Sequence, residues 1–206
     1  ISTWERGVAM MTPEDKAEYD ELGKVAGEAA IETNYEAIAN AKPDLIIIGV
    51  PKPVLPQLDL DRLSSIAPVV ALGPQHPSGW KDLTKRQLDA AGQSEFYEKA
   101  KKAYDEKAGA LKEKYAGVLG DLTFGHLGAY GEVSSGEFLR EFKESWGTNI
   151  AQDIGANYTG EVKKKEGGSS DVSEYPSIEE LPASFAGVDV ITYTLQDDGT
   201  PNESVQ

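Results

Sequence analysis

The chain has 206 residues, of which 39% are hydrophobic and 27% are charged, a composition typical of a globular protein with a sizeable core. It carries 35 acidic against 20 basic residues, and the resulting net charge of −15 argues against binding to nucleic acid or to an anionic lipid surface. Cysteine is absent, which excludes disulfides, thiol chemistry and cysteine-based metal sites. No apolar run reaches the roughly 18 residues that a membrane-spanning helix needs.

The first part of the chain alternates short aliphatic runs with amphipathic stretches, which is the pattern of βα units around a parallel sheet. A helix is expected to begin at a capping box over residues 33–36 and to end before Pro43. Strand, helix, strand and helix then follow at residues 44–49, 60–65, 67–72 and 80–91. We therefore predict a first α/β lobe over residues 1–93.

A long amphipathic helix is predicted from Ser94 to about Tyr115, with Gly117 ending it. Lysine and glutamate alternate on one face, and the other face carries apolar residues at steps of three and four, namely Tyr97, Ala100, Tyr104, Ala108, Leu111 and Tyr115. At 1.5 Å per residue such a helix spans about 30 Å, which suits a strut between two lobes over residues 94–116. An ordinary packed helix is the alternative.

Residues 117–206 are predicted to form a second α/β lobe. A capping box at residues 134–137 predicts a helix whose apolar stripe is Phe138, Phe142 and Trp146, so Trp146 is expected in the core. The other expected elements are a strand, a capped turn and a last strand, at residues 118–127, 177–180 and 188–193. Each lobe shows only two clear strands, so we expect a fragment that lacks elements at both ends, any targeting segment included.

The sequence contains no recognisable catalytic motif. Neither G-x-G-x-x-G nor G-x-x-x-x-G-K-[ST] is present, so the phosphate cradles of dinucleotide- and nucleotide-binding proteins are missing. The two histidines, His76 and His126, lack metal-binding spacing, and neither accompanies a nucleophile in a recognisable elbow. These observations predict binding rather than catalysis, with no metal held by the protein itself.

Several segments, in the same order along the chain, resemble signatures of one protein family. Residues 35–47, YEAIANAKPDLII, resemble an E-x-I-x-x-x-K-P-D-L-I signature, and residues 63–70 look like the element that follows it. Residues 175–182 and 188–191 are similar to a second-lobe S-x-E-x-L … D-V-I pattern. Over nearly its whole length, the chain therefore resembles the siderophore-type (class III, iron-complex) solute-binding proteins of ABC importers.

This resemblance implies two Rossmann-like lobes that are joined by a long rigid helix and hold a ligand in the cleft between them. It also implies that the ligand is delivered to an ABC permease outside the cytoplasm, in the periplasm or by a lipoprotein at the cell surface. The cysteine for a lipid anchor would lie outside this chain. We expect a monomer without enzymatic activity, without a nucleic-acid partner, and with no cofactor besides the iron of the chelated ligand.

Charge favours one class of ferric siderophore. Ferric tris-catecholates are strongly anionic, and binders of that class in the family use several arginines or lysines, whereas this chain has only four arginines. Arg62, Arg86 and Arg140 fall in helix patterns, which leaves Arg6 as the arginine expected near a ligand. Ferric tris-hydroxamates are neutral or cationic, so an acidic protein does not repel them and aromatic walls suit them. A hydroxamate ligand is therefore preferred.

Candidate ligand-binding residues lie on loops that follow strands, where open α/β sheets bind ligands. Tyr130 looks like the cleft tyrosine of the family, with a packed or surface tyrosine as the alternative. Hydroxamate binders of the family often carry a tryptophan and an arginine a few residues further on, but here those positions are Val133, Ser134 and Ser135. The other candidates are Arg6, Tyr175, Tyr193 and Trp80, of which Trp80 is alternatively a packing residue at a helix start.

Other functions remain open at this point. Haem or cobalamin is the alternative within the same family, because Tyr130 or Tyr175 could supply an axial ligand to haem. An α/β enzyme that uses carboxylates, or an interaction domain without a small ligand, is the alternative from another class. An enzyme predicts a strongly perturbed carboxylate in the cleft, whereas a binding protein predicts an aromatic-lined cleft.

Overall fold

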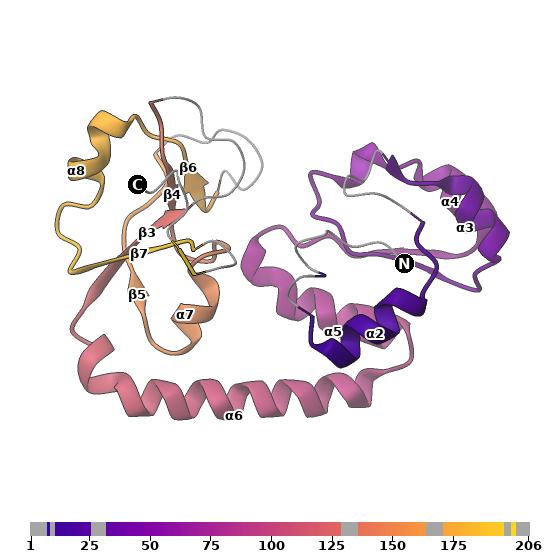
Figure 1. Cartoon of the computed structure of the whole chain (residues 1–206), viewed down its shortest axis with the longest axis horizontal. Helices are drawn as coiled ribbons and strands as arrows, with labels where there is room; N and C mark the ends of the chain where they lie inside the picture. Colours follow the sequence, from indigo (N-terminus) through magenta and orange to yellow (C-terminus); the bar gives the residue numbers. More distant parts are fainter. Residues whose placement is uncertain are drawn as a thin grey trace. The chain divides into compact units, whose positions relative to one another are not determined.

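The computed structural model describes residues 8, 11–25, 32–128, 136–163, 171–195 and 199–200 (Figure 1). The chain divides into two compact units. The first comprises residues 1–75 with 89–92, and the second comprises residues 76–88 with 93–206. Residues 76–88, expected in the first lobe, thus group with the second unit, and so does the long helix.

The first unit contains a small parallel sheet, in which β1 (Ile46–Ile48) lies beside β2 (Val69–Ala71) with Ile47 opposite Val70. Its helices are α2 (Pro13–Glu21), α3 (Tyr35–Ala41), the 3-10 helix η2 (Leu55–Gln57) and α4 (Leu60–Ile66). The βαβ order predicted for this part of the chain is confirmed.

Side-chain caps explain where the helices of this unit begin. The Asn34 side chain accepts the backbone N–H three residues later at 2.9 Å and starts α3, and Asp59 does the same for α4, also at 2.9 Å. The two helices place Ile38 and Leu63 against Ile48 of β1, and these three side chains form the buried core of the unit.

The long helix is confirmed as α6 (Ser94–Leu119), which follows α5 (Trp80–Ala90) in the chain (Figure 1). It extends beyond the predicted end, because Gly117 lies inside it. Tyr97 is buried and Tyr104 is half-buried, but Tyr115 is exposed, so the predicted apolar stripe packs against the protein only in part. None of the described helices is long and apolar enough to cross a membrane.

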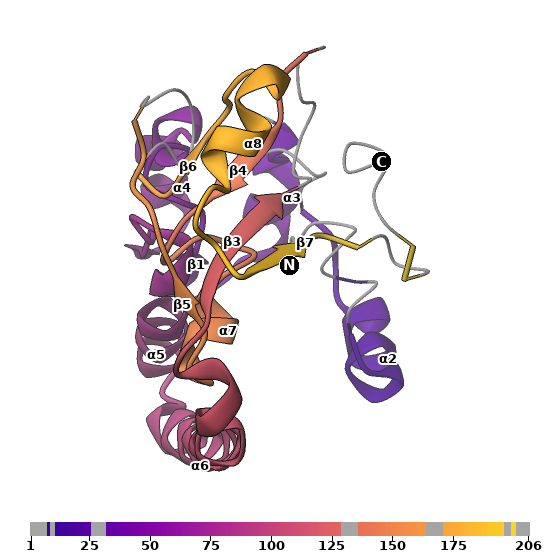
Figure 2. The ribbon, with the colours of Figure 1, turned by 90° about the vertical axis from the view of Figure 1, so that its left-hand side faces the viewer.

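The second unit is built on a mixed sheet around β3 (Thr123–Gly128) (Figure 2). β3 pairs in parallel with β5 (Asn157–Tyr158) and β7 (Val190–Tyr193). It pairs antiparallel with β4 (Leu139–Glu141), which in turn pairs antiparallel with β6 (Ser173–Glu174). The other elements are η3 (Pro77–Gly79), α7 (Asn149–Asp153), η4 (Ile178–Glu180) and α8 (Leu181–Ser184). Both units are α/β, as predicted.

The helix predicted from residue 134 onward is wrong, because Leu139–Glu141 form strand β4. Phe138 and Phe142, expected along one helix face, flank this strand and are 2% and 3% exposed. Residues 138–142 (FLREF) lack the alternation of apolar and polar residues that marks a half-buried strand. Glu141, which ends β4, is buried although it is charged. Trp146, expected in the core, is 41% exposed.

Leu63→Ala is expected to destabilise the first unit by about 2–5 kcal/mol, because it removes a fully packed side chain and leaves a cavity. Leu63 is 2% exposed, whereas Leu22, in the same unit, is 48% exposed and provides a matched control. Leu22→Ala should cost no more than about 0.5 kcal/mol. Urea unfolding followed by circular dichroism measures both, and equal losses would contradict the placement of the core.

Candidate ligand-binding site

The parallel strands of the second unit end side by side, because Leu127 of β3 lies opposite Tyr193 of β7. On the other side of β3, Gly128 lies opposite Leu139, and Tyr175 directly follows β6 at that same end of the sheet. We call this end the carboxyl edge. Open α/β sheets bind ligands at such edges. The structure thus brings Tyr175, which is half-buried, and Tyr193, which is 45% exposed, to one edge, and their role in binding stays a prediction.

Arg6 and Tyr130 lie outside the described residues, as do Val133, Ser134 and Ser135. In the sequence, Tyr130 comes two residues after Gly128, which is the last residue of β3. The proposed contacts of Arg6 and Tyr130 with a ligand therefore remain predictions.

Trp80 is packed at the start of α5. Its indole Nε1 donates a hydrogen bond to Asn149 Oδ1 at 2.9 Å, and its ring meets Tyr104 edge-on with the ring centroids 5.7 Å apart. Lys81 lies beside both rings and pairs with Asp153 at 2.5 Å. Burial, together with the hydrogen bond to Asp153, raises the pKa of Tyr104 to about 12. Trp80 is thus a packing residue at a helix start, which was the alternative predicted for it. A contact of Trp80 with a ligand remains a prediction.

Arg140 lies on a strand rather than in the predicted helix, and its charge is used within the protein. Its side chain is 11% exposed, with Nη1 3.6 Å from Glu174 Oε1 and the guanidinium carbon 4.6 Å from the centroid of the Phe142 ring. Burial lowers the pKa of Arg140, although the charge of Glu174 opposes this shift. Arg140 therefore stabilises the sheet instead of facing a ligand.

The other described arginines have protein partners too. The guanidinium carbon of Arg62 lies 4.7 Å from the centroid of the Tyr35 ring, and Arg86 Nη1 lies 3.9 Å from Asp82 Oδ2. Among the described residues, therefore, no cluster of arginines is available to neutralise a strongly anionic ligand.

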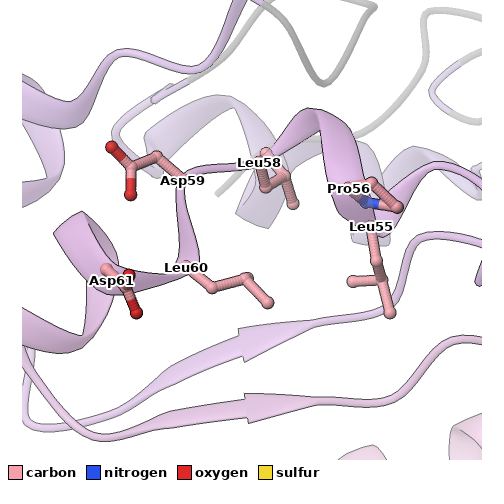
Figure 3. A pocket seen from close by; sticks show the side chains of 6 residues that line it. All are labelled: Leu55, Pro56, Leu58, Asp59, Leu60 and Asp61. Atoms are coloured by element: carbon pink, nitrogen blue, oxygen red, sulfur yellow. The ribbon is translucent and has the colours of Figure 1, made fainter.

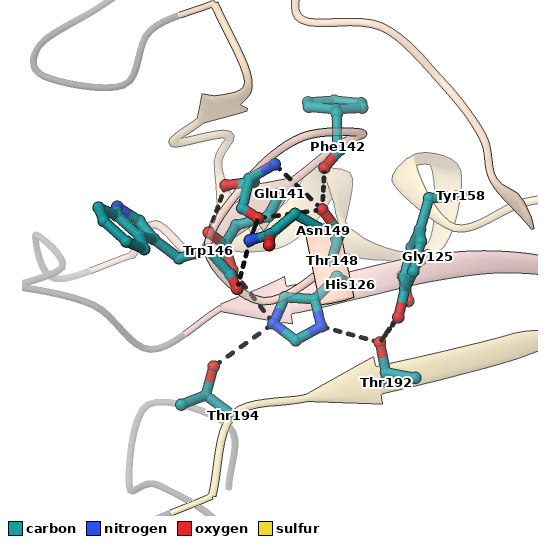
Figure 4. A network of polar contacts seen from close by, with 11 residues as sticks. Gly125, His126, Glu141, Phe142, Trp146, Thr148, Asn149, Tyr158, Thr192 and Thr194 are labelled. Atoms are coloured by element: carbon teal, nitrogen blue, oxygen red, sulfur yellow. Dashed lines mark hydrogen bonds and ion pairs between the residues drawn. The ribbon is translucent and has the colours of Figure 1, made fainter. Parts of the chain in front are cut away.

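A buried polar network joins the end of β3 to the turn after β4 (Figure 4). His126 on β3 is 4% exposed, with Nε2 3.1 Å from Glu141 Oε2 on β4 and Nδ1 2.8 Å from Thr192 Oγ1 on β7. Ser145 Oγ donates to Glu141 Oε1 at 2.5 Å. Three strands and the following turn are thereby held together by one histidine and one carboxylate.

The environment of Glu141 favours its charged form. Burial alone would raise the pKa of Glu141, but hydrogen bonds from His126 and Ser145, the charge of His126 and the backbone N–H of Gly147 outweigh burial and lower it. Sequence reasoning missed this network, because His126 was considered only as a metal ligand or catalytic base and Glu141 fell inside a predicted helix. A histidine within a predicted strand was the one available signal.

The described residues form hollows in each unit. One, of about 380 Å³ in the second unit, is lined by His76 and by residues 142–144, 160–162 and 171–172, and includes three carboxylates and one lysine. The other, of about 370 Å³ in the first unit, is lined by residues 55–56 and 58–61 and has no aromatic side chain (Figure 3). No group of three or more His, Asp or Glu side chains in the described part of the chain could hold a metal ion.

Glu141→Gln is expected to lower the free energy of unfolding by about 1–3 kcal/mol at pH 7, because it removes a charged acceptor from a buried network. The pKa of Glu141 is lower in the folded protein than its ordinary value of 4.5, so its contribution is present above pH 4.5 and is lost as the pH falls through the folded pKa. The difference between wild type and variant should therefore shrink in acid.

Urea unfolding at pH 7 and pH 3.5 measures this difference, with Glu113→Gln on the exposed face of α6 as the control. A gap between wild type and Glu141→Gln that stays constant over this pH range would contradict the assignment.

No protein-family model matches the chain, and no curated protein matches it. Solved structures do match. The siderophore periplasmic binding protein from the fuscachelin gene cluster of Thermobifida fusca superposes with a TM-score of 0.69 at 26% identity, covering 97% of this chain and 70% of that protein.

Two further solved structures, both less than 25% identical, show the same fold. Staphylococcus aureus SirA, also solved with staphyloferrin B, has a TM-score of 0.68 at 21% identity over 94% of this chain and 66% of its own. Streptococcus pneumoniae PiaA in complex with ferrichrome has a TM-score of 0.62 at 23% identity, and the match covers 90% of this chain and 61% of PiaA. With its α/β units, its 26-residue helix and this likeness, the chain has the fold of the siderophore-type (class III) solute-binding proteins and resembles them along nearly its whole length.

Proposed function

We propose that the protein is the extracytoplasmic substrate-binding component of an ABC importer and that it captures a ferric siderophore. The observation that carries this proposal is the likeness, over 97% of the chain, to the siderophore-binding protein of Thermobifida fusca. The likeness to PiaA and SirA, solved with ferrichrome and staphyloferrin B, supports it at the level of the fold. Delivery to a permease, a lipid anchor and a monomeric state are part of the proposal.

A ferric tris-hydroxamate is the preferred ligand. The net charge of −15 repels an anionic chelate, and the three described arginines are engaged by Tyr35, Asp82 and Glu174. A neutral or cationic chelate needs no such counter-charges and packs against aromatic side chains. The chelator satisfies the coordination of iron, so the protein supplies no metal ligand and no cofactor of its own.

The chemistry of the buried carboxylate favours binding over catalysis. A general acid needs a raised pKa and access to substrate. Glu141, the carboxylate of the buried network, is 5% exposed, its oxygens face His126 and Ser145, and its pKa is lowered. Haem or cobalamin is the second candidate ligand, favoured by the position of Tyr175 at the carboxyl edge.

Titration of the protein should show saturable binding of a neutral ferric tris-hydroxamate such as ferrichrome at micromolar or lower concentration. Binding of a ferric tris-catecholate should be at least about tenfold weaker, which is 1.4 kcal/mol, because the described part of the chain offers no free arginine cluster. Equilibrium dialysis measures both, with haem and cobalamin as further arms. Exclusive binding of haem or cobalamin would overturn the siderophore assignment, and tighter binding of the catecholate would overturn the hydroxamate preference.

Tyr130→Ala and Tyr193→Ala are each expected to weaken hydroxamate binding by about three- to tenfold, because each removes an aromatic contact. Tyr115→Ala is the matched control, since Tyr115 is 39% exposed on α6 while Tyr193 is 45% exposed at the carboxyl edge. Calorimetric titration measures all three variants. Unchanged affinity in both Tyr130→Ala and Tyr193→Ala would place the ligand elsewhere.

A further inference from the structure

An exposed tryptophan, Trp146, stands on a turn in which Ser145 and Thr148 are fully buried, while Lys143 and Glu144 are exposed. The side chain of Trp146 is 41% exposed, whereas Ser145 before it and Thr148 after it are both 0% exposed. A single exposed apolar residue needs no explanation in itself. Trp146 differs from the other exposed hydrophobic residues because hydrogen bonds hold its turn on both sides.

Hydrogen bonds fix the turn on both sides of Trp146. Thr148 Oγ1 donates to the Phe142 carbonyl at 2.6 Å and accepts the Ser145 N–H at 3.1 Å. Asn149 Nδ2 donates to the Ser145 carbonyl at 2.6 Å, and its Oδ1 accepts from Trp80 at 2.9 Å. Ser145 is also bound to the carboxylate of the buried network. The backbone that carries Trp146 is therefore fixed before any ligand arrives.

The turn also contains an unfavourable backbone conformation. Glu144 has a φ of 67°, in the left-handed region that non-glycine residues seldom adopt. Its N–H donates to Gln152 Oε1 at 2.8 Å, and its carbonyl accepts the N–H of Ser78 at 3.0 Å. Conformations of this kind persist where the surroundings enforce them, and they cluster at ligand-binding sites.

The turn lies over the end of β3. Gly147 packs so closely on His126 that a Cβ added to Gly147 would stand 2.0 Å from His126 Nε2. His126 is two residues before the end of β3 and contacts Thr192 and Thr194, which flank Tyr193. Figure 4 shows the indole of Trp146 turned away from His126 and Glu141. The ring is thus carried beside the carboxyl edge and does not join the buried network.

We propose that the indole of Trp146 is a wall of the siderophore site and contacts the apolar periphery of a ferric chelate without net negative charge. This inference rests on the proposed function and adds a ligand-binding residue to it. A rigidly held aromatic ring gives contact area at little cost in side-chain entropy. The net charge of −15 of the chain disfavours an anionic chelate at this ring.

Equilibrium dialysis with ferrichrome tests this proposal in the wild-type protein and in Trp146→Ala, Trp146→Phe and Tyr115→Ala. We expect Trp146→Ala to weaken binding by about tenfold and Trp146→Phe to restore most of the affinity, because a benzene ring keeps the contact. Tyr115→Ala is the control, because Tyr115 is an aromatic residue of similar exposure, 39%, on α6. Circular dichroism and thermal unfolding confirm that each variant is folded.

The possible results separate the two proposals. Failure of the wild-type protein to bind any ferric siderophore would overturn the proposed function and this inference with it. Wild-type binding with unchanged affinity in Trp146→Ala would overturn this inference and leave the function standing. If Trp146→Ala unfolds, Trp146→Phe and the wild-type protein are instead titrated with bulkier and smaller ferric hydroxamates. A ratio of variant affinity to wild-type affinity that is the same for every hydroxamate would overturn the inference.

Discussion

His126 and Glu141 face each other across 3.1 Å in a part of the second unit that water hardly reaches, the two residues being 4% and 5% exposed. Removing one member of such a pair leaves an unsatisfied buried group and is strongly destabilising. Through Thr192 the pair reaches β7, and through Ser145 and the Gly147 N–H it reaches the turn after β4. The pair therefore adds a buried side-chain link to the backbone pairing of β3 with β4 and β7, and it ties the turn to these strands.

The same contact determines what the carboxyl edge presents. Ser145, Thr148 and Asn149 satisfy one another's polar groups below the surface, and the exposed side chains of the turn are Lys143, Glu144 and Trp146. Tyr193 is exposed on a neighbouring strand end. Arg140 pairs with Glu174, which lies opposite it on the neighbouring strand β6, so β4 adds no free positive charge. An edge with aromatic rings and few cations suits a neutral ferric chelate better than an anionic one.

Local signals allowed much of the fold to be predicted, but little of the site. The capping signal at residues 33–36, the unbroken apolar run of β1 and the periodicity of α6 are local, so the first unit and α6 were predictable, although the residue that caps α3 is Asn34 and not Thr33. β4 was not, because Phe138 and Phe142 are four residues apart as in a helix, and the burial of Glu141 depends on His126, which is 15 residues away in the sequence. Trp146 was misplaced for the same reason.

The central claim is that a ferric siderophore binds at the carboxyl edge of the second unit, and paramagnetic broadening tests it most directly. Amide and indole N–H signals would be compared between the protein bound to ferrichrome and to its diamagnetic gallium analogue. If the siderophore binds at this edge, iron selectively broadens the indole signal of Trp146 and the amides of Gly128 and Tyr193. Tight binding that leaves these signals sharp and broadens others would contradict binding at this edge and place the ligand elsewhere.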